Sequence, residues 1–155
     1  MPAAEIALIP PRPDQLPLIR SYLAQLAQDE GVPKANAGDD FLATTLFGPT
    51  PAAIAHLVHR GPGLPCGLTI HSWKWGAFSG VMDMYLHVLV IDPASRGLGI
   101  GRAVMDKLLY IASAHGASRL ELLTTRDNAG AGAFYDALGL AQASHMVVRR
   151  RSCAS

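Results

Sequence analysis

The chain has 155 residues, of which half are hydrophobic and 16% are charged, and its formal net charge is +1. This composition fits one folded domain over residues 1–155 and excludes an intrinsically disordered chain. The near-neutral charge argues against a nucleic-acid partner, and no apolar run reaches the roughly 20 residues that span a membrane.

The first half of the chain predicts one strand, two helices and two more strands. Residues 5–9 are a short apolar run ended by two prolines, which predicts a strand. Apolar residues recur at helical spacing over residues 14–30, and residues 39–47 predict a shorter helix that a Gly-Pro pair ends. Residues 53–59 and 64–75 predict strands separated by a Gly-Pro-Gly turn.

The second half alternates strands and helices. Residues 82–91 are the most apolar predicted strand, and residues 99–115 carry an apolar stripe at helical spacing. A strand over 120–125, a short helix over 129–138 and a last strand over 141–150 follow. This order predicts a mixed α/β domain in which a central strand leads through a glycine-rich turn into a helix, a boundary where ligands commonly bind.

That turn has an arginine at each end. It consists of Arg96, Gly97, Leu98, Gly99, Ile100, Gly101 and Arg102. A helix N-terminus offers backbone N–H groups and positive potential to an anion. Gly97, Gly99 and Gly101 let a ligand approach the backbone closely and take conformations that a Cβ would forbid. The arginines can add charge-assisted hydrogen bonds. The turn therefore predicts a phosphate-bearing ligand, and the alternative is a glycine-rich turn without one.

The common nucleotide motifs do not fit this turn. A Walker loop needs Lys and then Ser or Thr after its last glycine, whereas Arg102 and Ala103 stand there. A dinucleotide fingerprint needs a glycine where Arg102 or Val104 stands, depending on which glycine begins the motif. A nucleotide-binding enzyme is therefore disfavoured.

Two motifs resemble one known family. Arg96, Gly99 and Gly101 fill the pattern [Arg/Gln]-x-x-Gly-x-[Gly/Ala], which resembles the acetyl-CoA loop of the GNAT N-acetyltransferases. Asn128, followed by Phe134-Tyr135 and then Leu-Gly-Leu, resembles the second half of that family's cofactor site. The resemblance implies the GNAT fold: a mostly antiparallel central sheet, splayed at the strand that ends near Ile91 and flanked by about four helices.

The resemblance also implies acetyl-CoA as the donor, with another acyl-CoA left open. A backbone N–H near Leu89 would stabilise the oxyanion that forms on the acetyl carbonyl. Asn128 either caps its helix alone or also meets the pantetheine arm. The implied cofactor-binding residues are Leu89, Val90, Ile91, Arg96, Gly97, Leu98, Gly99, Ile100, Gly101, Arg102, Asn128, Ala131 and Tyr135.

Two residues are candidates for proton transfer. By resemblance, Tyr135 would return a proton to the departing thiolate, and its alternative is aromatic packing beside Phe134. His87 has a side chain suited to accept the proton of the amine, and its alternative is a hydrogen-bonded strand histidine. The amine attacks the thioester directly in this reading, so Cys66 and Cys153 are not expected to be nucleophiles, and no metal site is expected.

The acceptor is less defined by the sequence. Residues 23–30, residues 46–48 and the Tyr-Leu pair at Tyr85 resemble the diamine, polyamine and thialysine acetyltransferase branch, which implies Asp29, Glu30 and Tyr85 as substrate contacts. Asp29 and Glu30 are alternatively a polar helix end. Two acidic residues follow the Tyr-Leu pair in that branch, whereas His87 and the valine after it stand here. A smaller or less cationic amine is therefore expected.

The remaining expectations concern the substrate, the location and the oligomeric state of the protein. The substrate partner is a small-molecule amine, with no nucleic acid and no membrane involved. No secretion signal is visible, so the expected location is cytoplasmic. The resemblance implies a homodimer. A catalytically silent acyl-CoA-binding or regulatory module of the same fold is the alternative to an enzyme.

Overall fold

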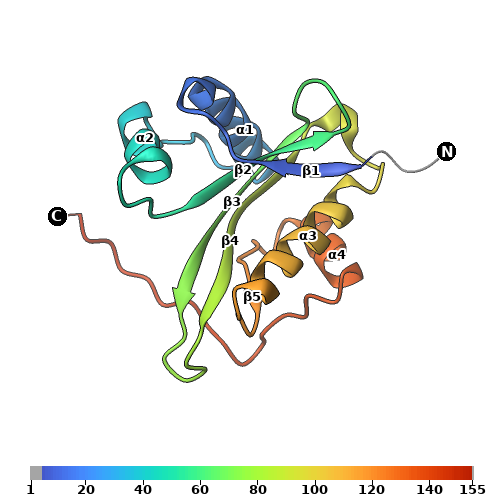
Figure 1. Ribbon diagram of the computed structural model, residues 1–155. Helices are drawn as coiled ribbons and strands as arrows, with labels where there is room; N and C mark the ends of the chain where they lie inside the picture. Colours follow the sequence, from blue (N-terminus) through green and yellow to red (C-terminus); the bar gives the residue numbers. More distant parts are fainter. Residues whose placement is uncertain (1–4, 155) are drawn as a thin grey trace. The chain divides into compact units, whose positions relative to one another are not determined.

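The computed structural model describes residues 5–154, and the chain divides into two compact units with a boundary between Leu123 and Thr124 (Figure 1). Within the described residues there are five strands and four α-helices, which confirms the predicted mixed α/β fold class. Their bounds are β1 Ile6–Ile9, α1 Leu16–Asp29, α2 Asp39–Phe47, β2 Ile54–Arg60, β3 Gly67–Trp75, β4 Met82–Ile91, α3 Ile100–Ala114, β5 Leu120–Glu121 and α4 Ala129–Ala137. That the whole chain is one domain stays a prediction.

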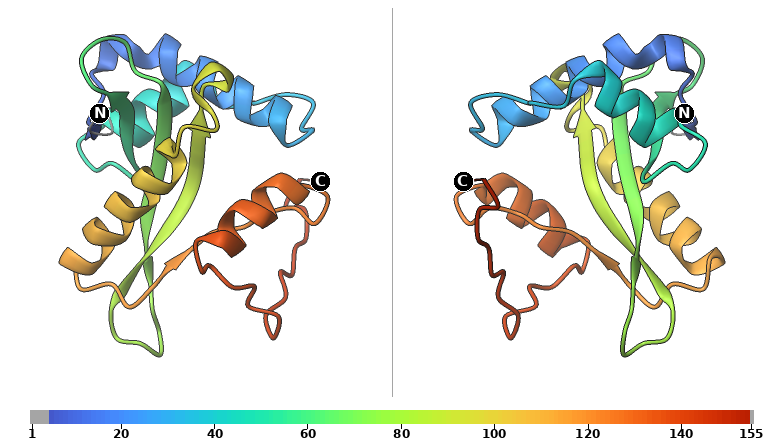
Figure 2. Two further views of the ribbon diagram at one scale, coloured as in Figure 1. Left: turned by 90° about the vertical axis from the view of Figure 1, so that its right-hand side faces the viewer. Right: turned by 90° about the vertical axis from the view of Figure 1, so that its left-hand side faces the viewer.

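The first unit is built on one sheet with the strand order β1-β2-β3-β4-β5. Strands β1 to β4 pair antiparallel, and β5 pairs parallel with β4. On one face the side chains of α1 pack against β2, β3 and β4, whereas α3 lies along the other face (Figure 2). The core under α1 consists of Ile19, Tyr22, Ala55, Leu57, Leu68, Ile70, Val88 and Val90.

Local signals set most element bounds. The predicted helix over 39–47 and strand over 82–91 have the bounds of α2 and β4. Strand β3 begins at Gly67 instead of residue 64, and Pro65 just before it has no N–H to donate to a ladder. Strand β5 ends at Glu121 instead of residue 125 because it pairs with β4 over only two residue pairs. Beyond them, β4 pairs only with β3, which is the predicted splay.

The predicted last strand over 141–150 is wrong. Residues 141–154 contain no strand, and Met146, Val147 and Val148 are all exposed. A strand is stabilised by the N–H and C=O groups of a partner, and its own residues cannot supply them. The three consecutive apolar residues also lack the alternation of a strand with one buried face.

None of the helices within residues 5–154 is long and apolar enough to cross a membrane.

Candidate active site

The end of β4 that leads to the glycine-rich turn has an open edge. The N–H of Asp92 donates to the carbonyl of Cys66, so it points toward β3. Backbone groups alternate in direction along a strand, so those of Val90 also face β3, whereas those of Leu89 and Ile91 face the side without a paired strand. Of the predicted cofactor contacts on this strand, Leu89 and Ile91 can therefore reach a ligand through their backbones.

A β-bulge in β4 changes which side of the strand the N–H and C=O groups of even-numbered residues face. Near the other end, the N–H of Met84 donates to Arg119 on the β5 side, although Met84 and Asp92 are an even number of residues apart. The register accounts for this reversal: Ile70 is opposite Val88 and His71 is opposite Leu86, which leaves His87 as the extra residue. The predicted base therefore lies at the irregular position of the strand.

His87 is an exposed side chain with two close neighbours. Its Nε2 lies 2.6 Å from Oγ of Ser72, and its ring centroid is 4.8 Å from that of Tyr85. Partial burial lowers the pKa of His87, so the neutral form that can accept a proton is favoured. Ser72 was missing from the predicted site, because the register that places it opposite Tyr85 depends on the bulge.

The glycine-rich turn has the backbone that the sequence predicts at two of its glycines. Gly97 and Gly99 have φ angles of +75° and +76°, in the left-handed region that favours glycine. Gly99 is the N-cap of α3, and no side chain among the described residues caps that end. The first N–H groups of a helix have no intrahelical acceptor, so those of Ile100 and Gly101 can bind an anion. Gly101 itself is helical.

The guanidinium of Arg96 makes two hydrogen bonds within the protein. Its Nε donates to the carbonyl of Ile91 at 2.9 Å, and its Nη2 donates to Oδ2 of Asp29 at 2.6 Å. Asp29, predicted to bind the acceptor, is thus paired with the donor loop. Leu98 is exposed in that loop, and Arg102 lies exposed in the first turn of α3.

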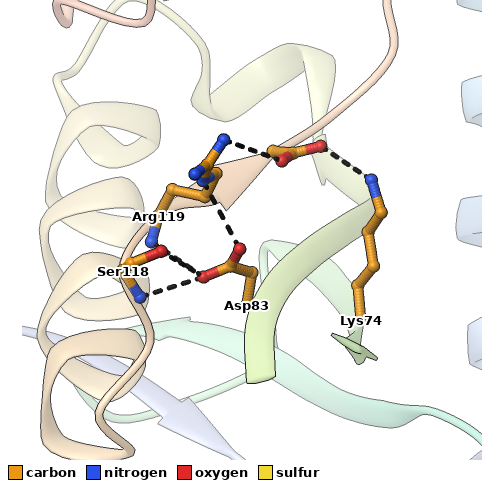
Figure 3. Close-up of polar contacts among 5 residues, drawn as sticks. Lys74, Asp83, Ser118 and Arg119 are labelled. Atoms are coloured by element: carbon orange, nitrogen blue, oxygen red, sulfur yellow. Dashed lines mark hydrogen bonds and ion pairs between the residues drawn. The ribbon is translucent and has the colours of Figure 1, made fainter. Parts of the chain in front are cut away.

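The other end of β4 is closed by a polar network (Figure 3). Oδ1 of buried Asp83 accepts hydrogen bonds from the backbone and hydroxyl of Ser118 and from the backbone of Arg119, at 2.9, 2.8 and 3.1 Å. Lys74 of β3 pairs with Glu121 of β5 at 3.0 Å. Burial by itself raises the pKa of Asp83, but the hydrogen bonds from Ser118 and Arg119 outweigh it and hold the pKa below its usual range.

Buried polar side chains also lie on β2 and β3. His71 is 1% exposed, and neither of its ring nitrogens has a hydrogen-bond partner among the described residues. Its ring stacks on that of His56 at 5.7 Å and meets that of Trp73 edge-on at 5.5 Å. Burial, followed by the nearby His56, lowers the pKa of His71 to about 4. His71 is therefore a neutral core residue at physiological pH.

The second unit carries the other predicted residues. Asn128 is the N-cap of α4, and its Oδ1 accepts a hydrogen bond from the N–H of Ala131 at 3.1 Å. The predicted cap is therefore confirmed, and a role toward pantetheine stays a prediction. The rings of Phe134 and Tyr135 meet edge-on with centroids 5.0 Å apart.

A cavity of about 640 Å³ lies between α1 and residues 32–37 of the first unit. Its charged lining residues are Arg20 and Lys34, and none of its described lining residues is a carboxylate.

Across residues 5–154, no group of three or more His, Cys, Asp or Glu side chains is placed to hold a metal ion. Of the two cysteines, Cys66 is buried, and burial raises the pKa of its thiol.

The chain is similar in sequence to known acetyltransferases. The model of the acetyltransferase (GNAT) family matches residues 48–140. A mycothiol acetyltransferase of Clavibacter michiganensis is 31% identical over 98% of this chain and 45% of its own length. A second mycothiol acetyltransferase, from Beutenbergia cavernae, is 41% identical over 35% of this chain and 18% of its own. The chain thus spans less than half the length of these relatives.

A solved structure has the same fold. An aminoglycoside N-acetyltransferase in complex with CoA superposes with a TM-score of 0.73, covers 99% of both chains and is 14% identical. An identity this low shows the fold alone. The diamine and polyamine branch implied by the sequence does not appear among these relatives, whose name instead refers to mycothiol.

Proposed function

The chain belongs to the GNAT acetyltransferase family, and we propose on that premise that it is an N-acetyltransferase that moves an acetyl group from acetyl-CoA to a primary amine. The observation that carries this proposal is the open edge of β4 leading directly into the glycine-capped N-terminus of α3. Backbone donors at Leu89 and Ile91 suit the amides of pantetheine, and the helix N-terminus suits a pyrophosphate.

The chemistry assigned to the chain is proton transfer and charge stabilisation. Acetyl-CoA supplies the thioester when bound. His87 accepts the proton of the attacking amine: in the tautomer whose Nε2–H donates to Oγ of Ser72, Nδ1 keeps a lone pair for that proton. The N–H of Leu89 donates to the carbonyl oxygen as negative charge develops there. Tyr135 returns a proton to the leaving thiolate.

The acceptor we propose is a small primary amine without polycationic character. Asp29, which would hold an ammonium in a polyamine enzyme, is occupied by Arg96. The cavity beside α1 carries two basic residues and no carboxylate, so it does not favour a polycation either. The names of the relatives make mycothiol-related amines the first acceptors to test.

The proposal is tested by release of free thiol from acetyl-CoA in the presence of mycothiol-related amines, amino acids, diamines and aminoglycosides. Turnover with one of these classes supports the enzyme. CoA binding by calorimetry without turnover of any of them would support the silent module, and absence of CoA binding would overturn the proposal. The expected homodimer and cytoplasmic location stay predictions, and light scattering checks the first.

Two variants then test the assigned roles. Tyr135→Phe removes one hydroxyl, and we expect turnover to fall by more than roughly ten-fold, or about 1.4 kcal/mol in the barrier. Tyr110→Phe removes the hydroxyl of an exposed tyrosine on α3 and should leave turnover unchanged. His87→Ala should lower turnover and flatten the rise of the rate below pH 6.5. Equal rates for Tyr135→Phe and Tyr110→Phe would remove Tyr135 from the mechanism.

A further inference from the structure

The last turn of α1 is joined to the donor loop by a chain of three contacts. Nε2 of Gln25 donates to Oδ1 of Asp29 at 2.9 Å, and Nη2 of Arg96 donates to Oδ2 of the same carboxylate at 2.6 Å. Nε of Arg96 then donates to the carbonyl of Ile91, the last residue of β4, at 2.9 Å. Both carboxylate oxygens of Asp29 are therefore engaged, and Arg96 bridges α1 and β4.

In this arrangement the positive charge of Arg96 is offset by the carboxylate of Asp29. The Asp29 side chain is 29% exposed and that of Arg96 is 45% exposed, so the pair is partly shielded from solvent. An arginine paired with a carboxylate adds little net positive charge to a nearby anion site. The attraction for phosphate then comes mainly from the N-terminus of α3.

The pair lies where the chain enters that N-terminus. Arg96 immediately precedes Gly97 and Gly99, whose left-handed conformations aim the backbone into α3. Two glycines make this segment intrinsically free to adopt other conformations. Holding Arg96 to Ile91 and Asp29 fixes the start of the segment while the buried Ile100 fixes its end.

We propose that Asp29 is a positioning residue for the donor loop: it holds Arg96 across the end of β4 and so keeps the first N–H groups of α3 in the geometry that binds the pyrophosphate. The proposal rests on the proposed function, because it names what Asp29 does for the same donor site. It replaces the expected role of Asp29 as an acceptor contact.

The experiment compares Asp29→Asn with Asp14→Asn, each measured for CoA binding by calorimetry and for the KM of donor and acceptor. Asp14 is a matched control, since it also pairs with an arginine, Arg12, at 3.0 Å on the surface. We expect Asp29→Asn to weaken CoA binding and raise the donor KM by roughly five- to ten-fold, with kcat and the acceptor KM changed less than about two-fold. Asp14→Asn should match the unchanged protein.

A second variant tests the same contact even if Asp29→Asn fails to fold. Arg96→Met removes the other member of the pair, so it should weaken CoA binding to a similar extent. The double variant should be no weaker than the worse single variant, because both substitutions break the same contact. Asp29→Glu, which keeps the charge, should recover part of the affinity.

Other outcomes would overturn the proposal in distinct ways. Tighter CoA binding by Asp29→Asn would mean that the carboxylate only repels the phosphates. A change confined to the acceptor KM would restore Asp29 as an acceptor contact, and values equal to those of Asp14→Asn would make the pair an ordinary surface salt bridge. If the unchanged protein binds no CoA, the proposed function fails first, and this is seen before any variant is compared.

Discussion

The two ends of β4 differ in how their backbone and charges are satisfied. At the end near Asp83, a buried carboxylate, three hydrogen bonds and flanking ion pairs tie β4 to the segment that begins β5. At the end near Ile91, no strand among residues 5–154 pairs with the other edge of β4, and the strand continues into an exposed glycine turn. One end is built for stability, and the other leaves donors for a ligand.

The difference explains where the sheet opens. Strand β5 is held only where the Asp83 network reaches it, and its pairing with β4 ends within two residues. The polar contacts of the closed end thus lie beside the paired residues, and the splay begins beyond them. Substitutions at the two ends should then separate stability from ligand binding.

The largest expected effect on stability comes from the closed end. Asp83→Ala leaves the donors of Ser118 and Arg119 without their acceptor, and we expect the free energy of unfolding to fall by about 3 kcal/mol. Urea denaturation measures this change. Lys74→Ala is the control, because it breaks a solvent-exposed pair and should cost less than about 1 kcal/mol. Equal losses in the two variants would contradict the comparison.

An effect of up to about the same size is expected from pH, through a buried histidine in the middle of the sheet. The pKa of His71 is about 4 in the folded protein and 6.5 in the unfolded chain, so the unfolded chain binds more protons between these values. Stability should therefore fall as the pH is lowered from 6.5 to 4, by up to about 3 kcal/mol and less if the core admits water.

Thermal unfolding across this pH range checks the expectation. His71→Leu should flatten the dependence, whereas replacing His145, an exposed histidine, by Gln should preserve it. A slope that is unchanged in His71→Leu would assign the acid sensitivity to other groups, among them His56, whose pKa burial also lowers. Asp83 adds its own loss at lower pH, since its pKa is held below 3.8 and its stabilising charge disappears as the pH falls through that lowered value.

The smallest effect on stability belongs to the open end. Gly99→Ala meets no atom within 4 Å, so its cost is the left-handed φ alone, about 1 kcal/mol. The same change should weaken CoA binding more than this loss of stability would suggest, because Gly99 caps α3. Gly132→Ala is the control, since that glycine is helical and open, and alanine there should stabilise by about 0.5 kcal/mol. A loss at Gly132 would contradict the reasoning.

Sequence reasoning succeeded where the signals are local. Strand β4 ends at Asp-Pro, α2 ends at Gly-Pro, and the glycines of the donor loop have the predicted conformations at Gly97 and Gly99. It failed where a distant partner decides the outcome. The strand expected over 141–150 lacks a partner, and the Arg96 contact joins residues 67 positions apart. No spacing in the sequence marks either one.

The extra residue at His87 has a further consequence for how such a strand can change. Without it, Val88 would follow Leu86 directly, and the pairs Ile70–Val88 and His71–Leu86 would succeed one another in regular alternation. The N–H of Leu89 would still face the open edge, but the contact between His87 and Ser72 would be lost. The bulge therefore inserts a polar side chain beside the ligand edge without changing which backbone groups face that edge.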